Sequence, residues 1–279
     1  MLLESGDTTN MAAAAGLAGM GQLHELARSP RALKLRAWLD SEMEIAPTPV
    51  YLPGSEFQLC VYQPTPASRE ELFARAKASP DRQMPYWADI WPSGLALGSF
   101  ALRYADRLAG KRVLEVGSGL GTTASATLRS GATLVAVDYT PLALGLCRYN
   151  ALVNVGASPR TFPLNWRELT PRALERLRAA GPYPIIMAAD VLYESRDIEP
   201  LIRLIDNLLE PDGMLWLSEP GRKVAARFLN TLAMRGWRFT THIVEGPWPG
   251  GQTDRINVHF LRREQGDTLP FSTVGGWRI

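Results

Sequence analysis

The chain has 279 residues, of which 46% are hydrophobic and 21% are charged, and its formal net charge is +2. The hydrophobic content is enough for one sizeable core. The charge balance lacks the domain-wide basic excess that is typical of nucleic-acid-binding proteins. Two cysteines argue against a disulfide framework and favour a reducing, cytoplasmic location. No apolar run has the length of a transmembrane helix, so we expect no membrane partner.

The first 80 residues are expected to form an extension. Residues 1–21 lack the basic start of a signal peptide and predict a flexible tail. Residues 22–45 have helical spacing, which Pro30 is expected to divide into two pieces. The proline-rich residues 46–66 predict a connecting arm with one short strand at 57–62. Ser68 is the expected N-cap of a helix that ends at residue 78.

From residue 111 onward, apolar runs of strand length alternate with helical segments, which is the pattern of a parallel sheet with helices on both faces. The expected strands are 112–116, 133–138, 161–164, 185–190 and 214–218. The expected helices are 122–130, 141–154, 171–180, 198–209 and 224–234.

Two more strands, at 238–244 and 255–261, are joined by a Gly/Pro-rich loop without a crossover, which predicts an antiparallel hairpin. The predicted fold class is therefore α/β and Rossmann-like, with a seven-strand sheet of five parallel strands plus the C-terminal hairpin. The expected units are the helical and extended segment 1–80, the α/β domain 81–263 and a C-terminal tail 264–279.

A glycine-rich loop is the strongest motif. Gly117, Gly119 and Gly121 follow an apolar strand and precede a helix. Glycine lets the backbone turn sharply and approach a ligand, and the start of a helix presents unpaired N–H groups. A dinucleotide fingerprint requires G-x-G-x-x-G, but Thr122 occupies its third glycine position. Glu115 would oppose a pyrophosphate and attract the amino group and sulfonium of S-adenosylmethionine, which is therefore the expected cofactor.

An acidic residue follows at the end of the second strand of this pattern. Asp138 lies 21 residues after Gly117, where an acid reaches ribose hydroxyls. Because NAD and S-adenosylmethionine both carry a ribose, Asp138 does not separate them, and the glycine spacing and Glu115 make that distinction. An NAD-dependent dehydrogenase stays open as a distant alternative.

With these residues in place, the chain resembles class I S-adenosylmethionine-dependent methyltransferases. Within them it is similar to the seven-strand protein-lysine methyltransferases that include the electron-transfer-flavoprotein β-subunit enzymes. The resemblance covers residues 84–263. Beyond the glycine loop, it rests on Trp91-Pro-Ser-Gly94, Leu164-Asn-Trp166, Asp190-Val-Leu-Tyr193 and Glu219-Pro-Gly-Arg222. The flavoprotein-directed subgroup has an aspartate where this chain has Glu219.

The resemblance implies roles for residues in these segments. Trp91 is expected near the methionine end of the cofactor, and Asn165 and Trp166 are expected around the adenine. The rest of the expected cofactor site comprises Ser118, Tyr139 and Ala189.

Asp190 and Tyr193 are the expected catalytic residues. The Tyr193 ring would hold an amine and its hydroxyl would orient the lone pair, whereas Asp190 would pair with an amino group of the cofactor or acceptor. Core packing for Tyr193 and helix capping for Asp190 are the alternatives. Tyr86, Trp87 and Trp248 are expected on the substrate side, with Trp248 exposed in a loop.

The sequence thus predicts an N-methyltransferase whose acceptor is foremost the lysine side chain of a protein. No metal site is expected, and all three histidines lie outside the motifs, which favours an amine over a hydroxyl acceptor. A small heterocyclic amine or natural product is the alternative acceptor. A non-catalytic cofactor-binding module is a more distant hypothesis for the function. A nucleic-acid partner is not expected.

Overall fold

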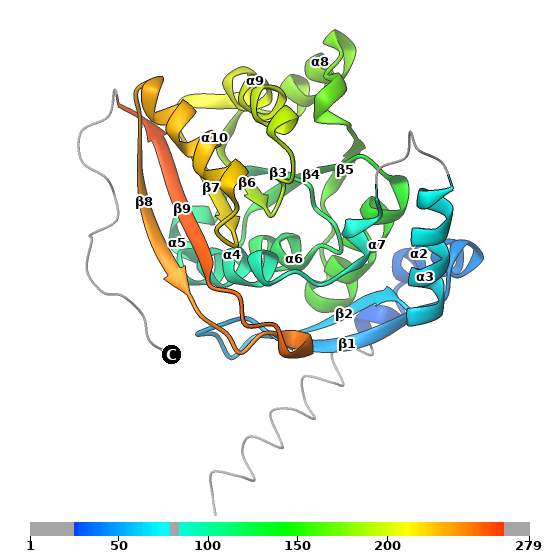
Figure 1. Cartoon of the computed structure of the whole chain (residues 1–279). Helices are drawn as coiled ribbons and strands as arrows, with labels where there is room; N and C mark the ends of the chain where they lie inside the picture. Colours follow the sequence, from blue (N-terminus) through cyan, green and yellow to red (C-terminus); the bar gives the residue numbers. More distant parts are fainter. Residues whose placement is uncertain (1–24, 79–83, 265–279) are drawn as a thin grey trace, which may run out of the picture.

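The computed structural model describes residues 25–78 and 84–264, and its central feature is a seven-stranded sheet (Figure 1). The strands lie in the order β5-β4-β3-β6-β7-β9-β8, and the first five are parallel. Those five are β3 (Arg112–Val116), β4 (Thr133–Asp138), β5 (Arg160–Pro163), β6 (Tyr183–Ala189) and β7 (Leu209–Glu219). The expected C-terminal hairpin is confirmed, with β8 (Trp237–Val244) and β9 (Ile256–Arg263) antiparallel to each other and β9 antiparallel to β7.

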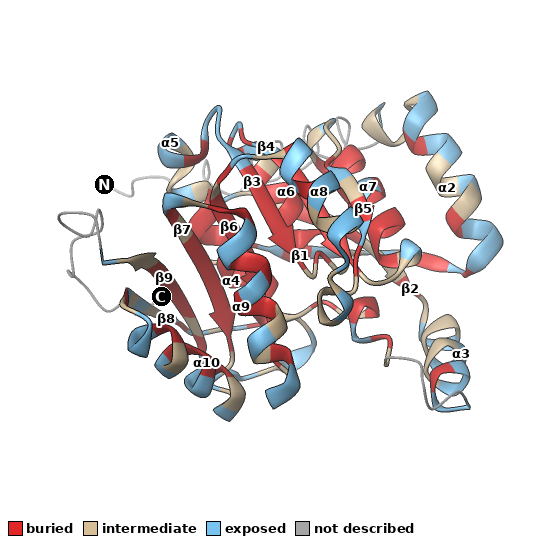
Figure 2. Ribbon diagram, turned by 90° about the horizontal axis from the view of Figure 1, so that it is seen from above, coloured by how far each residue is buried: buried red, intermediate tan, exposed pale blue. Residues whose placement is uncertain are grey.

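Helices cover both faces of the sheet (Figure 1). One layer contains α4 (Pro92–Arg103), the short α5 (Ala105–Leu108), α6 (Thr122–Arg129) and α7 (Pro141–Val155). The other layer contains α8 (Pro171–Ala180), α9 (Ile198–Leu208) and α10 (Lys223–Met234). The central strands are buried between these layers (Figure 2), which is why their sequences read as continuous apolar runs.

The strand order changes direction between β3 and β6. From β3 the chain proceeds to β4 and β5 on one side, and then returns to β6 and β7 on the other. In open α/β sheets, ligands bind at the carboxyl ends of the strands beside such a change of direction. The topology therefore places a ligand site where the segments after β3 and β6 meet.

The extension is more ordered than the expected arm. Where the sequence predicted one strand, β1 (Ile45–Tyr51) and β2 (Gln58–Pro64) form an antiparallel hairpin. The sequence does not predict β1, because Pro47 and Pro49 lack the N–H donor that a strand pattern requires. These prolines lie opposite Tyr62 and Cys60, whose backbone groups bond to asparagine side chains of α7 instead. The prolines thus occupy positions that need no ladder hydrogen bond.

Pro30 divides the helical segment of the extension as expected: residues 25–27 are helical, the chain turns at residues 28 and 29, and Pro30 is the first residue of a second helix, α2 (Pro30–Glu42), with Ser29 as the N-cap. The next helix begins earlier than expected. Helix α3 (Pro66–Lys77) begins before Ser68, and Thr65 caps it by accepting the Ser68 N–H.

Both expected tails, apart from residue 264, lie outside the described residues. Within the described ranges, no helix has the length and apolar character needed to cross a membrane.

Candidate active site

A cavity of about 680 Å³ lies at the carboxyl ends of the strands, beside the change of direction. Segments that follow β3, β4, β5 and β6 contribute to its wall, together with η1 (Tyr86–Ala88) from before α4. The structure therefore brings together residues from every motif that the sequence singled out, except the 219–222 segment.

The glycine loop forms one wall. Gly117 and Gly119 line the cavity, and both have a positive φ, at 73° and 47°. The Gly117 and Ser118 N–H groups donate to Val137 O, which fastens the loop to β4. Gly121 faces away from the cavity: a Cβ there would lie 2.7 Å from the Cα of Cys147 in α7. Ser118 and Gly121 thus shape the loop from outside the cavity wall.

Asp138, the last residue of β4, lines the cavity next to the glycine loop. Its carboxylate accepts hydrogen bonds from the Gly119 N–H at 3.0 Å and the Thr140 N–H at 3.4 Å. Burial, with only 3% of the residue exposed, raises the pKa of Asp138 to about 6, against the opposing effect of these N–H groups. The adjacent Tyr139 also lines the cavity, and its hydroxyl donates to Met84 O at 3.1 Å.

Glu115 is placed differently from our expectation. It is only 2% exposed and does not belong to the cavity wall. Its Oε2 has no hydrogen-bond partner within the described part of the chain. Burial, reinforced by the charge of Asp138, raises the pKa of Glu115 well above its usual range. A direct contact between Glu115 and a cationic ligand therefore has no support in this geometry.

The opposite wall comes from the segment after β5. Asn165 and Trp166 line the cavity, as expected of residues around a ring system. The Asn165 Oδ1 accepts the Arg167 N–H at 3.1 Å, which caps the short helix η2 (Trp166–Glu168). The Trp166 Nε1 is buried and lacks a partner among the described residues, so it presents an unused donor.

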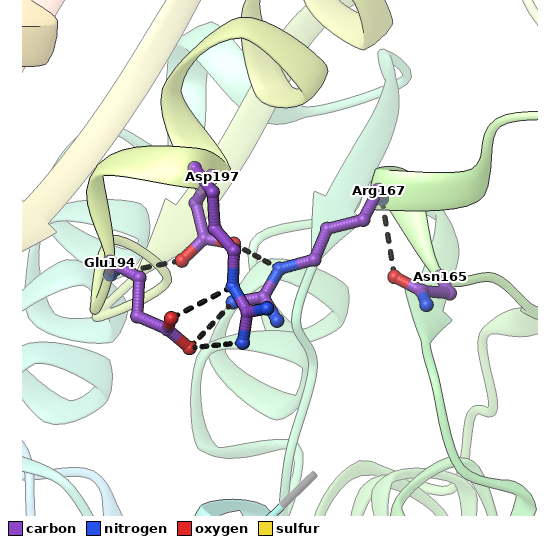
Figure 3. A network of polar contacts seen from close by, with 5 residues as sticks. Asn165, Arg167, Glu194 and Asp197 are labelled. Carbon is purple, nitrogen blue, oxygen red and sulfur yellow. Dashed lines mark hydrogen bonds and ion pairs between the residues drawn. The ribbon is translucent and has the colours of Figure 1, made fainter. Parts of the chain in front are cut away.

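Sequence reasoning missed an ion-pair network on this side (Figure 3). Arg167 bonds to Asp197 and to Glu194 Oε1, the latter at 3.1 Å, and Arg196 bonds to the same Glu194 oxygen at 2.9 Å. Glu194 and Asp197 also form the capping box of η3 (Ser195–Asp197) after β6. The network joins the segment after β5 to the segment after β6. The Glu194-x-x-Asp197 spacing could have predicted the capping box, but not the ion pairs with Arg167.

An aromatic cluster forms the remaining side. Tyr86 is 41% exposed and stacks on Tyr193 with ring centroids 5.4 Å apart. The Trp91 Nε1 donates to Tyr86 O at 2.7 Å, and Trp87 lies buried beneath. All four aromatic residues line the cavity. Burial raises the pKa of Tyr193, so its phenol stays protonated at neutral pH.

Asp190 lines the cavity beside Ala189, at the end of β6. Its φ of 51° is rare for a residue with a side chain. It does not cap the following helix, because Glu194 does. Its carboxylate is paired with Arg222, which lies outside the cavity wall.

Trp248 is not the exposed loop residue that we expected. It is 4% exposed, packs in the core, and donates from Nε1 to Asp254 O at 2.6 Å. The loop folds back through η4 (Pro249–Gly251), which buries the ring away from the cavity. The described residues also contain no group of three or more side chains suited to hold a metal ion.

The family-model and sequence comparisons match methyltransferases. A family model described as lysine methyltransferase matches residues 82–235. The chain is 32% identical over 192 residues to the electron transfer flavoprotein beta subunit lysine methyltransferase of Rattus norvegicus, covering 68% of this chain and 69% of that protein. It is 30% identical over 135 residues to the histone-arginine methyltransferase METTL23 of Xenopus laevis, covering 47% and 56% respectively. A solved structure of precorrin-6y C5,15-methyltransferase from Geobacter metallireducens GS-15 aligns with a TM-score of 0.48 and 13% identity, over 60% of this chain and 87% of that chain.

Proposed function

The chain belongs to the lysine methyltransferase family, and from this we propose that its cavity receives a lysine side chain of a protein substrate for methylation by S-adenosylmethionine. One observation carries the proposal: the glycine loop, Asp138 and the Asp190-x-x-Tyr193 motif all line the same cavity. Residues expected to hold the cofactor and residues expected to meet the acceptor therefore face one space.

The residues present fit the cofactor. Small-molecule sites have volumes of roughly 300–1,000 Å³, and this cavity lies within that range. Gly117 and Gly119 allow a ligand to approach the backbone, and the unpartnered Trp166 Nε1 supplies a buried donor. We assign Asp138 to the ribose hydroxyls and Asn165 with Trp166 to the adenine. Trp91 is assigned to the methionine end.

In the proposed reaction, the cofactor would supply the activated methyl group and the protein would position the acceptor. When bound, S-adenosylmethionine supplies a methyl group that is already activated by a cationic sulfur. The protein must align the acceptor, and alignment lowers the barrier by several kcal/mol. Tyr86 stacks on the Tyr193 ring and remains 41% exposed, so its outer surface is where an alkyl amine would pack. The Tyr193 oxygen accepts a hydrogen bond from the amine, which leaves the nitrogen lone pair free to face the methyl group.

Both cysteines are free, which supports a reducing, cytoplasmic location as part of this proposal.

The test is to incubate the purified full chain with isotope-labelled S-adenosylmethionine and a cell lysate. The products are separated by size, and peptide mass spectrometry locates the label. We expect label on lysine in the protein fraction. Asp138→Ala, checked for folding by circular dichroism, is the cofactor-site control and should lose the label. Label on arginine, or only in small molecules, would contradict the proposal.

A further inference from the structure

The acid of the Asp190-x-x-Tyr193 motif is already paired with a cation of this chain. The Arg222 Nε lies 2.8 Å from Asp190 Oδ1, and its Nη2 lies 3.1 Å from Oδ2. Such a bidentate pair is among the strongest charge-assisted arrangements in proteins. Asp190 is almost fully buried, so its carboxylate is shielded from water, whereas the Arg222 side chain is 33% exposed. The Asp190 carboxylate is therefore not free to receive a cation from the cavity.

Arg222 is held in place through Glu219 of β7 and through β9, the strand that pairs with β7. Its backbone N–H donates to Glu219 Oε2 at 2.6 Å. The other Glu219 oxygen accepts from Asn257 Nδ2 at 2.8 Å and lies 3.3 Å from His259 Nε2. Asn257 and His259 belong to β9, so this strand fixes the turn that carries Arg222.

Arg222 also contacts Tyr193. The guanidinium carbon lies 4.9 Å from the centroid of the Tyr193 ring, which stacks on Tyr86. Arg222 is not part of the cavity wall itself. Its guanidinium acts on a bound acceptor through Asp190 and Tyr193, the two cavity residues that it contacts.

Apart from Arg222, the charged groups that act on Asp190 and Tyr193 are acidic. Burial raises the pKa of Asp190, the charges of Glu219 and Asp254 raise it further, and Arg222 opposes them. Asp190 and Asp138 act on Tyr193 in the same way, again opposed by Arg222. Without Arg222, the Asp190 carboxylate would have no cationic partner among the described residues of this chain and would stabilise an ammonium in the cavity. An ammonium has no lone pair with which to attack a methyl group.

Building on the proposed function, we propose that Arg222 is a positioning residue that neutralises Asp190 and supports Tyr193, so that the site receives the acceptor as a neutral amine. The lysine proton goes to water before transfer. The nitrogen lone pair then forms the N–C bond as the C–S bond breaks. The positive charge passes from sulfur to nitrogen, and the sulfur keeps the bonding electron pair.

The test compares two cofactor analogues by calorimetry on the full chain. In sinefungin, a carbon that bears an amine replaces the methylated sulfonium of S-adenosylmethionine, whereas S-adenosylhomocysteine has a neutral thioether at that position. The preference for sinefungin is the Kd of S-adenosylhomocysteine divided by the Kd of sinefungin. In Arg222→Gln at pH 7, this ratio should increase by about tenfold, because the Asp190 carboxylate becomes free to pair with the sinefungin ammonium. Arg222→Lys keeps the charge and should retain the wild-type preference. Adding Asp190→Asn to Arg222→Gln should restore it.

Arg263→Gln is the matched control. Arg263 also pairs with a carboxylate, Asp206 at 3.1 Å, and contacts an aromatic ring, Trp237 at 4.8 Å, but it lies outside the cavity. This variant should keep the wild-type preference whatever its stability. An unchanged preference in folded Arg222→Gln overturns the proposal, as does an equal increase in Arg263→Gln.

The calorimetric result does not depend on a protein substrate. If the lysate is not labelled but the sinefungin preference increases in Arg222→Gln, the lysine acceptor is refuted and the role of Arg222 is supported. Labelled lysines with an unchanged preference would refute the role of Arg222 alone.

Discussion

The side chain of Asn150 in α7 bonds to the backbone of Tyr62 as a neighbouring strand would. Its Oδ1 accepts the Tyr62 N–H at 2.8 Å, and its Nδ2 donates to Tyr62 O at 2.9 Å. The same Nδ2 donates to Leu120 O at 2.8 Å, within the glycine loop. One buried amide thus connects the hairpin of the extension with the loop expected to hold the cofactor.

Replacing Asn150 with Leu should weaken both the fold and cofactor binding. The backbone groups of Tyr62 and Leu120 would lose their partners in a buried place, at a cost of about 2–5 kcal/mol in unfolding free energy. Urea unfolding measures this loss, and calorimetry with S-adenosylhomocysteine should show a higher Kd.

Asn154→Ala is the matched control for this prediction. Asn154 makes the same pair of bonds to the backbone of Cys60, at 2.8 and 2.9 Å, but none to the glycine loop. We expect a similar loss of stability with little change in Kd. An equal loss of affinity in both variants would show that Leu120 is not the link.

Cofactor affinity should fall as the pH drops through about 6. Above this pH the Asp138 carboxylate is ionised and accepts hydrogen bonds from ribose hydroxyls, and below it the carboxyl is protonated. Binding of S-adenosylhomocysteine, measured from pH 5 to 8, should therefore weaken toward acid. Asp138→Asn should bind more weakly at neutral pH and lose most of this dependence. A wild-type affinity that does not change over this range would rule out the assignment of Asp138.

The same carboxylate should destabilise the ligand-free fold. Because burial raises the pKa of Asp138 above its unfolded value, the folded chain binds more protons between these two values. Its contribution to stability therefore decreases as the pH rises through that window, and the loss is complete above the folded pKa. Asp138→Asn should raise the unfolding free energy at pH 7.5 by about 1–3 kcal/mol, as thermal unfolding would show. A lower melting temperature for this variant would contradict the argument.

Local patterns account for what the sequence predicted correctly. Strand-length apolar runs and the spacing from Gly117 to Asp138 lie within one continuous segment, and they suffice for the sheet and one cavity wall. The Asp190–Arg222 pair bridges 32 residues and the Asn150–Tyr62 bonds bridge 88, so no local pattern reveals them. Strand β1 was not predicted for a related reason: Pro47 lies opposite Tyr62 of β2, whose backbone groups bond to the distant Asn150 of α7 rather than to β1.

The prediction for Trp248 was wrong because the Gly/Pro-rich composition of its loop suggested an exposed side chain. Since its ring is buried and its Nε1 is bonded, Trp248→Ala should cost about 3–5 kcal/mol in stability. Trp248→Phe keeps most of the packing, and it should retain wild-type methylation of the labelled lysate with a lower melting temperature. A selective loss of methylation in stable Trp248→Phe would restore a role at the substrate side.

Gly121→Ala should be among the most damaging single-methyl changes in this site. The new Cβ would lie 2.7 Å from Cys147 Cα and 3.0 Å from Cys147 O, and the φ of 79° already disfavours a side chain. Helix α6 would have to move away from α7 and take the glycine loop with it, so both unfolding free energy and S-adenosylhomocysteine affinity should fall. Gly251→Ala is the control, since its φ is 72° but nothing lies within 4 Å of the added Cβ, and it should cost only about 1 kcal/mol. Because the closest contact, at 2.7 Å, is with the Cα of Cys147, whereas its Sγ lies 3.0 Å from the added Cβ, removing the sulfur with Cys147→Ala should not rescue Gly121→Ala. Rescue by that second change would place the clash at the sulfur instead.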